Sequence, residues 1–210
     1  MTKVKICGIT NLDDALASVK FGADMLGFNF YEKSKRYISP KEALDIVKEL
    51  PSNIQKIGVF VNEPIENVLA ITHQVGLDAI QLHGDEDMAY VTGLKNSSEK
   101  IIIKAFRVGP KFDMDEVLSW PWDFPLFDAY TANEYGGTGE TFDWDDFGFQ
   151  IYLWLPASAY IAGGLNPENV AEAVRWTFPY AVDVASGVES SPGKKDPKKL
   201  EAFIRNAKNA

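Results

Sequence analysis

Short apolar runs alternate with amphipathic stretches from one end of the chain to the other. This alternation is typical of β-strands that crossover helices join into a parallel sheet. Eight runs have the length and composition of strands: Lys3 to Cys7, Met25 to Phe28, Lys56 to Val61, Ala79 to His83, Ile101 to Phe106, Pro125 to Asp128, Ala159 to Ala162 and Val182 to Ala185. The pattern therefore predicts eight βα units.

Polar capping residues mark where the intervening helices begin. We expect them to start after Asn11, Ser39, Glu63, Asp85, Asp113, Asp143, Asn166 and Asp196. Ser39-Pro40 and Asn166-Pro167 carry the fullest start signal, because each sets a capping side chain before a proline at the first helical position. The sixth helix has the weakest pattern, since Gly148 interrupts a short aromatic segment.

Eight such units predict an α/β fold, a (β/α)8 TIM barrel. No composition shift, Ser/Gly linker or low-complexity run divides the chain, so we expect residues 1–210 to form a single domain. An open, doubly wound sheet is the structural alternative, although it would not need eight strands.

Composition narrows the function further. The 21 Lys and Arg residues against 30 Asp and Glu give a net charge of −9, which argues against nucleic acid as a partner. One cysteine and two histidines are too few for a zinc or iron–sulfur site, so no metal is expected, and a reducing cytoplasm fits best. No signal peptide opens the chain, and the longest uncharged stretch, Ile151 to Leu165, is broken by Pro156, Ser158, Gly163 and Gly164, so no membrane span is expected.

Strand alternation predicts which polar side chains point into the barrel. In the first predicted strand, Val4 and Ile6 share a face suited to packing on helices, so Lys5 and Cys7, which alternate with them, are expected to point into the barrel. The same reasoning turns Gln81, His83, Lys104 and Asp183 inward. Cys7, His83 and Asp128 end three different strands, where barrel active sites form. One layer deeper, Lys5, Lys104 and Asp183 require partners, and we expect them to form an ion network.

Glycine-rich loops follow the last two predicted strands. Gly163-Gly164 and Ser186-Gly187 stand where barrels often bind phosphate, because glycine lets backbone N–H groups approach an anion. We therefore predict a phosphate-binding type of barrel. A third loop, Tyr135 to Gly139, contains Gly137 and is long enough to form a lid. Arg36, in a basic cluster after the second strand, is a candidate for holding a substrate carboxylate bidentately.

Seven segments together resemble the phosphoribosylanthranilate isomerase family over essentially the whole chain. They are Lys5-Ile6-Cys7-Gly8-Ile9-Thr10, Ser34-Lys35-Arg36-Tyr37-Ile38, Gly58-Val59-Phe60-Val61-Asn62, Gln81-Leu82-His83-Gly84, Gly136-Gly137-Thr138-Gly139 with Phe142-Asp143-Trp144, Gly163-Gly164-Leu165-Asn166-Pro167-Glu168-Asn169-Val170, and Val182-Asp183-Val184 through Ser186-Gly187-Val188-Glu189. Glu140 departs from the pattern, since a basic or neutral residue is expected after the Gly-Thr-Gly run.

This resemblance implies a cofactor-independent enzyme of tryptophan biosynthesis. The reaction would be the Amadori rearrangement of N-(5-phosphoribosyl)anthranilate to 1-(2-carboxyphenylamino)-1-deoxyribulose 5-phosphate. Cys7 would be the general base, Asp128 the general acid and Arg36 the contact for the anthranilate carboxylate, while the glycine loops hold the phosphate. His83 is interpreted as a hydrogen-bonding wall of the site.

The two proton carriers need shifted pKa values for this chemistry. Asp128 must stay protonated, which requires burial or a nearby anion, and Cys7 must ionise, which a cation favours. Lys5 is the nearest cation in sequence and shares the face of Cys7. The expected partner is thus a small phosphorylated substrate with a carboxylate, and the chain would be a monomer or a homodimer.

Three other functions compete with this interpretation. A histidine-pathway aminoaldose isomerase performs the same rearrangement with two aspartates, and Cys7 argues against it. A Schiff-base aldolase would use an inward Lys104. A non-catalytic phosphate-binding barrel would need neither Cys7 nor Asp128.

Overall fold

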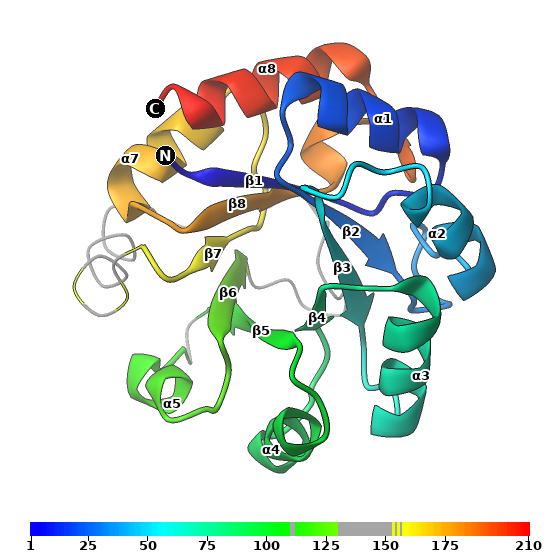
Figure 1. Cartoon of the computed structure of the whole chain (residues 1–210). Helices are drawn as coiled ribbons and strands as arrows, with labels where there is room; N and C mark the ends of the chain where they lie inside the picture. The colour runs from blue at the N-terminus through cyan, green and yellow to red at the C-terminus, as the bar shows by residue number, and fades with distance from the viewer. Residues whose placement is uncertain (110–111, 130–152, 154, 156) are drawn as a thin grey trace.

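A closed barrel of eight parallel strands forms the centre of the computed structural model, which describes residues 1–109, 112–129, 153, 155 and 157–210. Each strand pairs with the next in chain order, and β8 closes the barrel against β1 (Figure 1). The strands are β1 (Lys3–Cys7), β2 (Met25–Asn29), β3 (Gln55–Phe60), β4 (Ala79–Leu82), β5 (Ile101–Val108), β6 (Phe124–Ala129), β7 (Tyr160–Ile161) and β8 (Ala181–Val184). The predicted TIM barrel is confirmed, with strand ends that differ from expectation by at most two residues.

Helices surround the strands as an outer ring (Figure 1). The described helices are α1 (Leu12–Phe21), α2 (Pro40–Val47), α3 (Ile65–Val75), α4 (Met88–Ser97), α5 (Met114–Leu118), α7 (Val170–Thr177) and α8 (Pro197–Lys208). None of these helices is long and apolar enough to cross a membrane. Two short elements precede α8, the 3-10 turn η1 (Ser186–Val188) and an antiparallel hairpin of β9 (Glu189–Ser191) and β10 (Lys194–Lys195), and the hydrophobic pattern predicted neither.

Four predicted helix starts are confirmed at the residue. Asn11 caps α1 by accepting from the Asp14 amide, and Asp113 and Asp196 cap α5 and α8 in the same way. Ser39 forms a reciprocal capping box with Glu42, so both orphan donors at that helix end are satisfied.

Three other helices begin later than predicted. Asn166 does not cap α7, because its Oδ1 accepts from the Glu168 and Asn169 amides and closes a turn before the helix starts at Val170. Asp87 rather than Asp85 caps α4, and α3 begins one residue later than predicted, at Ile65. The helix predicted after Asp143 lies outside the described residues.

Two apolar layers hold the barrel together. The larger fills the space between strands and helices, and the smaller fills the barrel interior. The interior layer consists of Met25, Ile57, Ala79, Ile103, Ala105, Leu126, Tyr160, Ala162 and Ala181. It plugs the barrel below the polar side chains, so the functional groups sit on a packed floor rather than in a pore.

The prediction that Lys104 points into the barrel is wrong. Ile103 and Ala105 belong to the interior layer, so alternation turns Lys104 toward the helices. Its Nζ donates to Glu86 Oε2 at 2.7 Å and to the Gly84 carbonyl at 2.9 Å. The expected ion network therefore separates into two pairs, Lys5 with Asp183 inside the barrel and Lys104 with Glu86 outside it.

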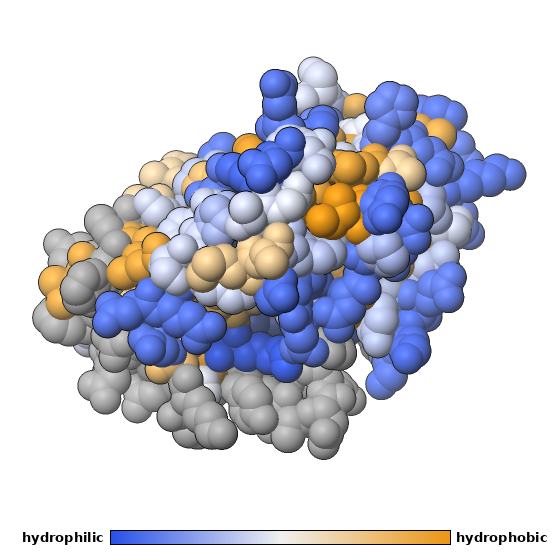
Figure 2. Space-filling model, turned by 90° about the horizontal axis from the view of Figure 1, so that it is seen from below, coloured by the Kyte–Doolittle hydropathy of each residue, from blue (hydrophilic) through white to orange (hydrophobic). Residues whose placement is uncertain are grey.

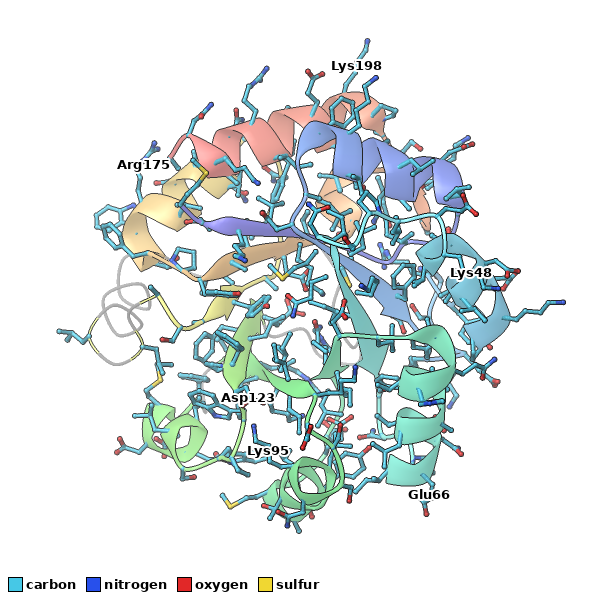
Figure 3. All side chains as sticks on the ribbon, in the orientation of Figure 1. Lys48, Glu66, Lys95, Asp123, Arg175 and Lys198 are labelled. Carbon is cyan, nitrogen blue, oxygen red and sulfur yellow. The ribbon has the colours of Figure 1, made fainter. Side chains whose placement is uncertain are left out.

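Charged side chains project from the outer helices. Lys48, Glu66, Arg175 and Lys198 point away from the barrel, whereas Lys95 of α4 pairs with Asp123 before β6 (Figure 3). Seen from below, hydrophilic residues cover most of the coloured surface, with smaller hydrophobic areas between them (Figure 2). This distribution agrees with the acidic, highly charged composition.

Candidate active site

A cavity of about 620 Å³ opens at the carboxyl ends of the strands. It brings together most of the residues selected from the sequence: Cys7, Arg36, His83, Asp128, Gly163, Gly164, Asp183 and Ser186 all line it. These side chains come from six of the eight βα units, so only the closed barrel makes them neighbours. Gly137, Glu140 and the rest of the predicted lid lie outside the described residues.

Lys5, Asp183 and Cys7 form the charged floor on the β1–β8 side. Lys5 is fully buried, and its Nζ donates to Asp183 Oδ2 at 2.8 Å. The two residues are direct neighbours in the parallel register, so the pairing follows from strand alignment alone. Burial would lower the pKa of Lys5, but Asp183 and Cys7 raise it above its usual value. Asp183 thus favours the ammonium form of Lys5.

The pKa of the Cys7 thiol lies above its usual value. Burial raises its pKa, and the raising effect outweighs the opposing effects of Lys5 and Lys195, while Asp183 raises the pKa further. Lys5, the nearest cation in sequence, lowers the pKa of Cys7 as expected, but its effect does not offset that of burial. A second cation, Lys195, comes from the other end of the chain.

Asp128 lies in a hydrogen-bonded row with His83 and Gln81. Its Oδ2 is 3.0 Å from His83 Nε2, and His83 Nδ1 is 2.8 Å from the Gln81 side-chain amide nitrogen. With Gln81 as donor, Nδ1 accepts and Nε2–H points at the Asp128 carboxyl group. His83 is therefore the hydrogen-bonding wall that the sequence predicted, and Gln81 fixes its tautomer.

Arg36 extends from the loop after β2 into the cavity, and its guanidinium group is bound by the carboxylate of Glu189. The guanidinium Nε and Nη2 donate to the two Glu189 carboxylate oxygens, each at 2.8 Å, in a bidentate pair. Gly8, at φ +73°, leaves the space for this side chain, because a Cβ there would lie 2.6 Å from Arg36 Cδ. Burial would raise the pKa of Glu189, but Arg36 and Lys195 lower it below its usual value.

Sequence reasoning missed Glu189 and Lys195 as site residues. Lys195 is 2 % exposed, and its Nζ donates to the Cys7 carbonyl at 2.6 Å, to Glu189 Oε1 at 2.9 Å and to the Ala185 carbonyl at 3.1 Å. The only available signal was a Lys-Lys-Asp run before the last helix, which ordinarily indicates a solvated surface.

The two glycine loops meet where the sequence placed a phosphate. Gly163 and Gly164 adopt φ values of 82° and 64°, the left-handed region that favours glycine. Gly187 packs against the other loop, because a Cβ there would stand 1.9 Å from the Leu165 carbonyl oxygen. Among the described residues, no group of three or more His, Cys, Asp or Glu side chains is arranged to hold a metal ion.

Comparison with known proteins identifies the family. Residues 4–206 match the family model for N-(5'phosphoribosyl)anthranilate (PRA) isomerase. The N-(5'-phosphoribosyl)anthranilate isomerase of Citrifermentans bemidjiense is 47% identical over 208 residues, which cover 99% of this chain and 98% of that protein.

Two crystal structures are similar along the full length of both chains. One is a phosphoribosyl anthranilate isomerase in complex with reduced 1-(o-carboxyphenylamino)-1-deoxyribulose 5-phosphate, with a TM-score of 0.87 and 43% identity over 100% of each chain. The other contains monomers of the dimeric enzyme from Thermotoga maritima, with a TM-score of 0.86 and 43% identity over 100% of each chain. This chain belongs to the N-(5'-phosphoribosyl)anthranilate isomerase family.

Proposed function

We infer that this protein catalyses the Amadori rearrangement of N-(5-phosphoribosyl)anthranilate in tryptophan biosynthesis, with Cys7 as general base and Asp128 as general acid. The observation that carries this assignment is that a thiol on β1 and a carboxyl group at the end of β6 line one cavity together with Arg36 and the two glycine loops. An acid and a base on different strands can act on opposite sides of a bound sugar.

The proton transfers balance without a cofactor. Asp128 gives its proton to the furanose ring oxygen, the C1′–O bond breaks, and the anthranilate nitrogen forms a C=N bond to C1′. The Cys7 thiolate then removes the C2′ proton, and the electron pair moves to form an enolamine. When this enol tautomerises to the ketone, C1′ takes up the proton held by Cys7 and the C2′ hydroxyl gives its proton to the Asp128 carboxylate, so both residues return to their starting states while C1′ is reduced and C2′ oxidised within one molecule.

Charges in the cavity suit both ends of the substrate. Arg36 would bind the anthranilate carboxylate, since guanidinium and carboxylate match in geometry. Backbone N–H groups of the loops at Gly164 and Ser186 would bind the phosphate. Asp183, His83 and the backbone at Gly163 and Gly187 would complete the sugar and phosphate contacts.

A Schiff-base aldolase is not favoured. Lys104 faces the helices, and its Nζ is held by Glu86 and the Gly84 carbonyl. Reaction with a carbonyl substrate would require the amine to leave both partners.

The test of the proton carriers uses Cys7→Ser and Asp128→Asn. Each variant is expected to lower kcat by about 10² to 10⁴-fold, the usual contribution of general acid–base catalysis, while the circular dichroism spectrum stays unchanged. Decay of substrate fluorescence measures turnover on freshly prepared phosphoribosylanthranilate. His73→Gln, on the exposed side of α3, serves as the control. Near-native kcat in either site variant would refute the assignment, and Arg36→Met is expected to raise KM more than it lowers kcat.

We further propose that residues 1–210 act as one domain in the cytoplasm. The relative from Thermotoga maritima is described as dimeric, and the sequence left monomer and homodimer as alternatives. Light scattering on the purified protein distinguishes the two.

A further inference from the structure

The hairpin of β9 and β10 carries two buried charges that the proposed mechanism does not use. Glu189 is 7 % exposed and Lys195 is 2 % exposed, and they form a direct ion pair at 2.9 Å. Burying two charges costs several kcal/mol in desolvation, which their attraction offsets only with good geometry and further hydrogen bonds. Such a pair at the edge of the cavity calls for a role beyond packing.

Lys195 connects two parts of the site through the backbone. Its Nζ donates to the carbonyl of Cys7, the last residue of β1, and to the carbonyl of Ala185, directly before the Ser186 loop. The amide of Lys195 in turn donates to Asp14 Oδ2 at 2.8 Å, which anchors the hairpin on α1. The buried ammonium group is therefore held against the Cys7 and Ala185 backbone by hydrogen bonds.

Glu189 connects Lys195 to Arg36, the residue proposed to bind the substrate carboxylate. One carboxylate oxygen accepts from both Lys195 Nζ and Arg36 Nε, and the other accepts from Arg36 Nη2. The Gly193 amide adds a further hydrogen bond at 3.3 Å. Cys7, Arg36 and the Ser186 loop are consequently tied to a single buried pair.

We propose that Lys195 and Glu189 are positioning residues of opposite electrostatic effect, in which the Lys195 charge stabilises the Cys7 thiolate and Glu189 moderates that charge while orienting Arg36. The proposal rests on the role of Cys7 in the proposed function. It explains how the half-buried Cys7 thiol can ionise although its pKa is raised, because a cation held at the Cys7 backbone carbonyl favours the anion.

Other charges also act on Cys7 and are common to every variant below. Lys5 on β1 and Asp183 on β8 shift its pKa, and Arg36 after β2, His83 after β4 and Asp128 on β6 line the same cavity. Lys5 is already neutralised by Asp183 at 2.8 Å. The charges of Lys195 and Glu189 are thus the part of the electrostatic field at Cys7 that can be changed without substituting a residue of β1 or β8.

The experiment measures Cys7 ionisation directly. Cys7 is the only cysteine in the 210-residue chain, so the rate of alkylation by iodoacetamide as a function of pH reports the thiolate fraction of this residue alone. At pH values below the midpoint of the alkylation profile, Lys195→Met is expected to lower the alkylation rate about tenfold. At the same pH values, Glu189→Gln is expected to raise that rate. A merely structural role would not shift the two profiles in opposite directions.

Lys104→Met is the matched control, because Lys104 also forms a buried pair with a glutamate, on the outer side of the barrel. Its alkylation profile should coincide with that of the native chain. If Lys195→Met does not fold, the isosteric Glu189→Gln decides the question, and an unchanged or slower alkylation rate in that variant refutes the proposal. Shifts of equal sign in the two variants, or an equal shift in Lys104→Met, refute it too. Absence of isomerase activity in the native chain would instead refute the proposed function, since alkylation does not depend on turnover.

Discussion

Removing one partner of the Lys5–Asp183 pair is expected to destabilise the fold strongly, whereas removing both is not. Lys5 is fully buried and Asp183 is 6 % exposed, with 2.8 Å between Nζ and Oδ2. At an effective dielectric constant of about 20, the attraction at this distance is about 6 kcal/mol. Desolvation of two ions costs several kcal/mol each, so the intact pair contributes close to zero net stability.

Lys5→Met leaves Asp183 as an uncompensated buried charge. The expected loss is about 3–5 kcal/mol in the free energy of unfolding. For a chain of this size, each kcal/mol corresponds to about 2–4 °C in Tm, so Tm should fall by about 6–20 °C. In Lys5→Met with Asp183→Leu, apolar side chains of similar volume replace both ions, and most of the lost stability should return.

Urea denaturation followed by circular dichroism measures both variants, and equal m-values establish that the same surface is exposed on unfolding. The double variant should be folded and yet inactive, because Asp183 lines the cavity. A double variant as unstable as Lys5→Met would refute the reasoning, since it would mean that the pair itself, and not the orphaned carboxylate, carries the energy.

Three further changes test the local structure. Gly187→Ala should raise KM at least tenfold, because its Cβ would stand 1.9 Å from the Leu165 carbonyl oxygen, whereas Gly93→Ala in α4 is the control, because a Cβ there would meet only the Ile65 side chain, at 3.3 Å. Ser39→Ala should lower the free energy of unfolding by about 1 kcal/mol through loss of the capping box, as measured by urea denaturation, and an unchanged midpoint would contradict the capping assignment. Burial and nearby glutamates raise the pKa of Tyr90 to about 12. The stability that its protonated hydroxyl contributes is therefore complete below pH 10 and is lost as pH rises through 12. Tyr90→Phe should remove this part of the fall in the free energy of unfolding at alkaline pH.

Strand alternation predicted the interior polar residues of β1 and β4, because the residue pattern within each of these strands was enough to tell its two faces apart. Lys5, Cys7 and Gln81 lie inside because β1 and β4 carry aliphatic residues on the opposite parity. The same rule failed for Lys104, because both faces of a parallel barrel strand are apolar and the sequence of β5 does not reveal which face is the interior. The deciding partner, Glu86, lies 18 positions away, in the loop between β4 and α4.

The pairing of Arg36 with Glu189 could not be predicted for a related reason. The two residues are separated by 153 positions, and no local periodicity connects a loop after β2 with a hairpin after β8. Asn166 illustrates a smaller failure, since an Asn-Pro start signal also fits a turn that delays the helix by three residues. Local signals predict elements, whereas long-range ion pairs depend on how the barrel closes.

The distribution of ion pairs explains why Asp128 is suited to carry a proton. Among the residues that the structure describes, three carboxylates line the cavity: Asp128, Asp183 and Glu189. Lys5 neutralises Asp183, and Arg36 with Lys195 neutralises Glu189, so protonating either of these would break a buried ion pair. Within the described part of the chain, the ion partner of Asp128 is His83, which is an ordinary hydrogen-bond donor when neutral. Of these carboxylates, Asp128 is the one whose charge is not matched by a lysine or arginine in the described residues, which supports the proposal that it is the general acid. A net charge of −9 is compatible with an anionic substrate, because the other two carboxylates are paired with cations.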